Sequence, residues 1–118
     1  MKRLNFFLKL VLPLFALSSC GGVLKNTWTI TDFNKTHSFA ISTEEGQDVT
    51  GARTYIDGDF TGTIYLSTVE NDSTLRYTQK SLPEDGILSD FYGGTFEMFL
   101  AKSDAQGEIT VTIEIPYH

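Results

Sequence analysis

Few side chains in this 118-residue sequence have the types and spacing that chemistry requires. Asp57 and Asp59 flank a glycine, and Glu44, Glu45 and Asp48 lie in an earlier polar segment. Carboxylate oxygens on a loop are what Ca²⁺ binds, but Ca²⁺ takes six or more oxygens, and this stretch lacks the spacing of a calcium-binding loop. We therefore expect no metal site, with Asp57 and Asp59 as incomplete calcium candidates in a solvated turn.

Catalytic groups are equally sparse. Glu84, Asp85 and Asp90 could supply paired carboxylates for hydrolysis, but they lie in or beside a polar loop with no sign of burial. His37 and His118 are the only histidines, and His118 ends the chain, where fraying is expected. No G-x-S-x-G nucleophile motif occurs. The sequence predicts a protein that is not an enzyme, with no catalytic residues and no cofactor.

The single cysteine, Cys20, follows a segment with the layout of an export signal. That segment begins with basic residues, continues with an apolar stretch over 10–17 and ends in two serines. A membrane-spanning helix needs about 20 apolar residues, and Lys9 interrupts this one. Residues 1–19 are therefore predicted to be a signal peptide, helical where it precedes the folded domain.

The tetrapeptide Leu17-Ser18-Ser19-Cys20 resembles the lipobox of bacterial lipoproteins. The resemblance implies cleavage just before Cys20, fatty acyl chains on that residue, and a lipid-anchored place in the bacterial cell envelope. A thiolate is the nucleophile that such a modification needs, and two or more acyl chains anchor a protein stably. A glycine directly after the cysteine, here Gly21, resembles the pattern of lipoproteins that are forwarded to the outer membrane. A lipidated Cys20 leaves no thiol for a disulfide, a zinc site or catalysis.

Charge narrows the choice of partners. Removal of residues 1–19 leaves 99 residues, enough for one domain. It also removes three of the nine basic residues and none of the 15 acidic ones, so the formal charge becomes −9. Nucleic-acid binding needs a basic footprint, which this composition excludes. We expect the membrane contact to come through the lipid on Cys20 alone.

The rest of the sequence alternates at period two, as strands do. In residues 109–115 four aliphatic side chains face one side, and Phe96, Met98 and Leu100 alternate in the same way. The polar segment 103–107 between them predicts a closing hairpin with Gly107 at positive φ. Asp57-Gly58 predicts a second, two-residue turn. Further strands are expected over 28–30, 38–41, 54–56, 60–68 and 75–78.

Seven short strands at this spacing predict an all-β fold, a small antiparallel sandwich of immunoglobulin-like or transthyretin-like arrangement. The expected boundaries are a lipidated Cys20 with a flexible tether over 20–26, and a single β-sandwich domain over 27–118. Residues 55–64 (YIDGDFTGTI) also resemble the hairpin core of PEGA-type surface modules. Those modules are small sandwiches that serve as envelope spacers or interaction units, and the later half of the chain is similar to small uncharacterised bacterial lipoproteins.

Aromatic residues provide the remaining candidates for binding. Tyr65, Tyr77 and Tyr92 are predicted as contact residues, since aromatic faces on a sheet can bind a protein or a sugar. Trp28 is expected to plug the sandwich beside the tether. The preferred hypothesis is a non-enzymatic, lipid-anchored module that presents a face or an edge strand to another envelope protein. A surface glycan-binding module is the alternative, and a small hydrolase is third.

Overall fold

The computed structural model describes residues 21–68 and 71–118. The predicted signal helix, the lipobox and Cys20 lie outside these residues. The described chain forms eight strands and one short 3₁₀ helix, η2 (Gln79–Ser81). The strands are β1 (Gly22–Ile30), β2 (His37–Ser42), β3 (Gly51–Thr61), β4 (Ile64–Thr68), β5 (Asn71–Tyr77), β6 (Ile87–Asp90), β7 (Thr95–Leu100) and β8 (Gln106–Tyr117). No helix in the described ranges is long and apolar enough to cross a membrane.

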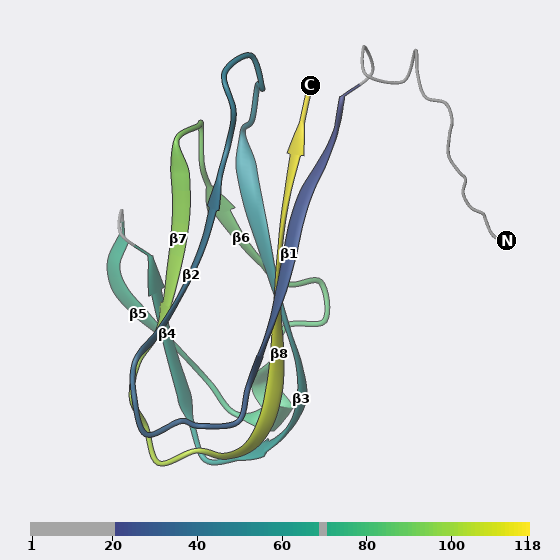
Figure 1. Ribbon diagram of the computed structural model, residues 1–118. Helices are drawn as coiled ribbons and strands as arrows, with labels where there is room; N and C mark the ends of the chain where they lie inside the picture. The colour runs from purple at the N-terminus through teal and green to yellow at the C-terminus, as the bar shows by residue number, and fades with distance from the viewer. Residues whose placement is uncertain (1–20, 69–70) are drawn as a thin grey trace, which may run out of the picture.

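Two antiparallel four-stranded sheets face each other, with the orders β1-β8-β3-β6 and β2-β7-β4-β5 (Figure 1). The first strand pairs with the last, the second with the seventh, the third with the sixth and the fourth with the fifth. This nested pairing is that of a jelly roll. The predicted all-β antiparallel sandwich is confirmed, but its strand order is neither immunoglobulin-like nor transthyretin-like.

The eighth strand is β6, which was not predicted, and the first strand begins earlier than expected. Residues 22–26, which we expected to be a flexible tether, form the first half of β1 and pair with residues 113–117 of β8. The two glycines suggested disorder, but Leu24, Trp28 and Ile30 share the alternation that faces the sheet interior. The sandwich therefore begins at Gly22 rather than at residue 27, and only Gly21 separates it from Cys20.

The core lies between the sheets and follows the predicted alternation. The side chains at 109, 111, 113 and 115 of β8 are fully buried, as are Met98 and Leu100 of β7. They pack with buried side chains from the other strands and loops, which include Ile30, Phe33, Phe39, Val49, Ala52, Phe60, Ile64, Leu66, Ile87, Phe91 and Phe96. Such burial is the main stabilising term for a sandwich that has no cysteine in its described residues.

Both predicted hairpins are wrong. β7 and β8 belong to different sheets, so the segment between them crosses the sandwich instead of turning back within one sheet. The chain also runs straight through Asp57-Gly58, which lies inside β3, and the PEGA-like hairpin is absent. Gly58 keeps a positive φ of 127° and Gly107 one of 126°, in strands rather than in turns.

The C-terminus is held in place instead of fraying. The backbone N–H of His118 donates to the carbonyl of Asp48 at 3.0 Å, and the N–H of Asp48 donates back to His118 at 3.1 Å. This pair ties the end of the chain to the segment between β2 and β3. The start of β1, the end of β8 and the loop between β6 and β7 all lie at this end of the sandwich (Figure 1).

Candidate functional site

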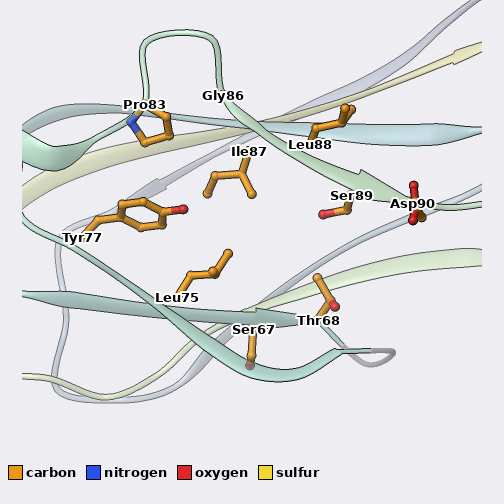
Figure 2. A pocket seen from close by; sticks show the side chains of 10 residues that line it. All are labelled: Ser67, Thr68, Leu75, Tyr77, Pro83, Gly86, Ile87, Leu88, Ser89 and Asp90. Carbon is orange, nitrogen blue, oxygen red and sulfur yellow. The ribbon is translucent and has the colours of Figure 1, made fainter.

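A wide opening separates the edge strands β5 and β6. Each of these strands is the last in its sheet, and a cavity of about 710 Å³ lies between them. Figure 2 shows side chains from both sheets around it. The lining comprises Ser67, Thr68, Leu75, Tyr77, Pro83, Gly86, Ile87, Leu88, Ser89 and Asp90. A cavity of this size falls in the range of ligand and peptide sites.

Register explains which side chains of β6 enter the cavity. Ile87 lies opposite Thr54 and Ser89 opposite Ala52, both of which are buried on the inner face of β3. Ile87 and Ser89 therefore face inward, while Leu88 and Asp90 face outward. Leu88 is 68% exposed, which is unusual for a leucine on a strand that ends a sheet. β6 thus carries an apolar side chain on each face, Ile87 toward the cavity and Leu88 toward the outside.

From the opposite sheet, β5 contributes the apolar wall. Leu75 and Tyr77 are half-buried and pack against the core, and in Figure 2 both extend toward Ile87 across the opening. Ser89 and Thr68 add hydroxyl groups farther along the cavity. The lining therefore combines an apolar wall with a few hydroxyl groups, which is the usual composition of a binding cleft.

The segment between β5 and β6 covers the edge of β3 beyond β6 but leaves the outer edge of β6 free. The Gln79 side chain of η2 donates from Nε2 to the carbonyl of Gly58 at 2.7 Å, and its Oε1 accepts from the N–H of Phe60 at 2.7 Å. Gln79 thereby takes the place of a neighbouring strand along the part of β3 that extends beyond β6. Arg53 of β3 donates from Nη1 to the carbonyl of Asp85 at 2.6 Å and holds the turn before β6.

Carboxylates lie at and beside the opening, and Asp90 is the one charged residue among the described residues of its lining. Exposed Glu84 and Asp85 precede β6 in the adjoining turn. None of the ten lining residues is basic. The one ion pair within the described ranges, Lys25 to Glu114 at 3.6 Å, lies on the outer face of β1 and β8. A ligand for this opening is therefore favoured if it carries positive charge.

The three predicted tyrosines do not all gather on one surface, although Tyr65 and Tyr77 border a common hollow. Tyr77 lines the cavity, Tyr65 lies on the outer face of β4 opposite Arg76, and Tyr92 lies in the loop between β6 and β7. Tyr65 and Tyr77 both border a smaller hollow of about 290 Å³. Tyr92 is 75% exposed, as expected for a contact residue, whereas Tyr65 and Tyr77 are half-buried. A flat aromatic platform is not formed by these residues.

The candidates for metal binding and catalysis do not converge either. Asp57 and Asp59 lie on the exposed face of β3, and Asp57 accepts a hydrogen bond from the N–H of Gly58 at 3.2 Å. Among the described residues no group of three or more histidine, cysteine or acidic side chains is placed to hold a metal. His37 Nε2 lies 2.6 Å from the carbonyl oxygen of Asp32, and its ring stacks on Phe39.

Residues that our reading of the sequence missed are Ile87, Leu88 and Ser89. They form a four-residue strand with Asp90, too short to show a clear alternation, directly after the polar run 83–86. The one signal in the sequence was the pair of adjacent apolar residues, Ile87 and Leu88, directly after the polar run.

Comparison with protein-family models, with curated proteins and with solved structures finds no match to the chain.

Proposed function

We propose that this protein is a non-enzymatic interaction module of the bacterial cell envelope, anchored by lipid on Cys20, that binds another protein at the opening between β5 and β6. The observation that carries the proposal is the cavity between two edge strands, with an apolar inner wall and an exposed Leu88 beside it. Exposed apolar side chains next to a cleft are typical of interaction sites.

The anchoring part of the proposal rests on the lipobox-like residues 17–20 and on the position of β1. Because Gly22 already belongs to β1, a lipid on Cys20 would hold the sandwich at one end, close to the bilayer. That end carries Tyr92 and the loop between β2 and β3, whereas the opening lies between the edge strands β5 and β6. A partner in the envelope could then reach β6 without displacing the domain. Localisation in the outer membrane follows the Gly21 resemblance and is part of the same proposal.

The other two functions have less support. A glycan-binding module needs aromatic rings that form one platform. Tyr65 and Tyr77 border one hollow but belong to opposite faces of their sheet, and Tyr92 lies in a separate loop. A hydrolase needs an acid or base beside a nucleophile. His37 contacts a backbone carbonyl, and no acidic side chain is among its hydrogen-bond partners in the described structure.

Site-specific photocrosslinking in native membranes tests the proposal. A photoreactive amino acid replaces Leu88 in the full-length protein, and a control protein carries it at Ser42, an exposed position on β2 away from the opening. We expect the Leu88 position to form an adduct with one envelope protein that the Ser42 position does not capture. Ser89→Phe, which places a ring inside the cavity, should abolish that adduct.

Equal labelling from the two positions, or an adduct that survives Ser89→Phe, would show that the opening is not the binding site. The circular dichroism spectrum of Ser89→Phe is recorded in parallel. Retention of the β-sheet signal is needed to assign a lost adduct to the filled cavity.

A further inference from the structure

The free edge of β6 determines what kind of segment fits the opening. Building on the proposed function, we propose that the ligand is an extended polypeptide segment, alternately apolar and basic, which adds to β6 as a further strand of its sheet. β6 ends the order β1-β8-β3-β6, so within residues 21–68 and 71–118 one edge of its backbone has no strand beside it. Unpaired N–H and C=O groups along such an edge are a template for another strand.

The dimensions of β6 limit the length of the segment. Its four residues extend over about 13 Å at the usual rise per residue. A strand added along it would therefore pair over about four or five residues, with the rest of the peptide extending beyond the edge. The neighbouring edge of this sheet, on β3 beyond β6, is already occupied by the Gln79 side chain. Strand addition is thus directed to β6.

Side-chain alternation then selects apolar residues at every second position. Side chains of an added strand that point inward would meet Leu75, Tyr77 and Ile87, the apolar wall of the cavity. Directly opposite side chains on neighbouring strands lie close enough to interact. The inward positions of the segment should therefore be aliphatic or aromatic.

The outward positions meet a different surface. Asp90 faces outward at the end of β6, and Glu84 and Asp85 precede the strand. Lysine or arginine at the alternate positions would lie beside these carboxylates, while glutamate would be repelled. The negative formal charge, −6 for the whole sequence and −9 after removal of residues 1–19, attracts a basic segment over a longer range as well.

A second copy of the chain is a poorer ligand by the same reasoning. Pairing of two β6 edges would bring together two chains of the same negative formal charge and would place no basic side chain of β6 beside Asp90. A basic peptide removes that repulsion. Sedimentation velocity distinguishes these two cases, because self-association that Ser89→Phe abolishes would identify a second copy as the ligand and overturn the proposal.

Fluorescence anisotropy with the full-length protein in a non-ionic detergent provides the main test. The probe is a labelled synthetic peptide of about nine residues that alternates valine and lysine. A matched peptide alternates valine and glutamate. Two further peptides carry backbone N-methyl groups, one on all lysines and the other on all valines, so that each lacks the N–H groups along one edge only.

We expect the valine–lysine peptide to bind and the valine–glutamate peptide to bind at least about tenfold more weakly. One N-methylated series should lose binding and the other should retain it, because strand addition uses one edge of the peptide. Asp90→Lys should weaken binding by about tenfold, while Asp104→Lys, an exposed acidic residue in the loop between β7 and β8, should not.

Equal binding of the basic and acidic peptides would overturn the charge selection, and equal binding of both N-methylated series would overturn strand addition. These comparisons use the unaltered protein, so they do not depend on how any variant folds. If the peptides fail while the Leu88 crosslink persists and responds to Ser89→Phe, the opening still binds a protein but by another mode. If both experiments fail, the proposed function fails with this inference.

Discussion

The rings of Trp28 and Phe39 lie 5.2 Å apart at an angle of 53°, and this contact joins the edge strands β1 and β2. It closes one side of the sandwich. On the opposite side, the edge strands β5 and β6 enclose the cavity of about 710 Å³. The two pairs of edge strands therefore differ: an aromatic contact joins β1 and β2, whereas a cavity separates β5 and β6. The binding function is proposed for the pair that the cavity separates.

Trp28→Ala should destabilise the fold. Trp28 is half-buried and packs against the core, so we expect a loss of about 2–3 kcal/mol, somewhat below the cost for a fully buried aromatic residue. Trp28→Phe, which keeps a ring against Phe39, should cost about 1 kcal/mol. Urea unfolding followed by circular dichroism measures both. A Trp28→Ala protein as stable as the wild type would mean that this contact does not close the sandwich.

Gly58 and Gly107 should tolerate no side chain. A Cβ at Gly58 would lie 2.3 Å from the carbonyl oxygen of Glu108, and one at Gly107 would lie 2.3 Å from that of Asp59. Each residue also has a positive φ that other residues adopt only under strain. We expect Gly58→Ala and Gly107→Ala each to cost at least about 2–3 kcal/mol.

Gly46→Ala is the matched control for these two glycines. Gly46 also has a positive φ, of 90°, but a Cβ added there would meet no other atom within 4 Å. Its substitution should therefore cost only about 1 kcal/mol. Thermal unfolding separates the two contributions, and a Gly46→Ala loss as large as that of Gly58→Ala would remove the argument from close strand approach.

Thr54→Val should leave the fold intact and raise its stability. Thr54 is 0% exposed, and its Oγ1 has no hydrogen-bond partner in the described structure. An unpaired buried hydroxyl costs about 1–3 kcal/mol, and valine keeps the shape without it. We expect a gain of about 1 kcal/mol in the free energy of unfolding. Thr110→Val on the outer face is the control and should change stability by less than about 0.5 kcal/mol. A destabilised Thr54→Val protein would indicate that the hydroxyl is hydrogen-bonded.

The sequence predicted which side chains are buried better than it predicted which strands are neighbours. Alternation at 109–115 and at 96–100 sets the inner face of a strand, and the structure agrees. Alternation does not say which sheet the strand joins, so the short polar connection between β7 and β8 suggested a hairpin although it crosses between sheets. Asp57-Gly58 carried a turn signal, but pairing with Thr110 and Ile109 of β8 keeps it extended.

The candidate site was harder to predict than the fold. Its walls come from β5 and β6, which are adjacent in sequence but lie in different sheets, so the opening depends on the strand order of the whole sandwich. Tyr77 was predicted and does line it, whereas Ile87 and Ser89 belong to a strand too short to recognise. No local pattern encodes that two particular strands will end their sheets side by side.

The anchor can be tested independently of the fold, since Cys20 precedes the sandwich by one residue, Gly21. Cys20→Ser removes the proposed lipid site and takes nothing from the core, so we expect the protein to leave the membrane fraction, to stop labelling with fatty acid and to keep a β-sheet spectrum with a cooperative melt. Ser19→Ala, which keeps a small residue before the cysteine, should label and fractionate like the wild type. If Cys20→Ser loses the label but remains in the membrane pellet after high-salt washing, something other than lipid holds the protein there. If the wild type itself never labels, Cys20 is not lipidated and the anchored module must be abandoned.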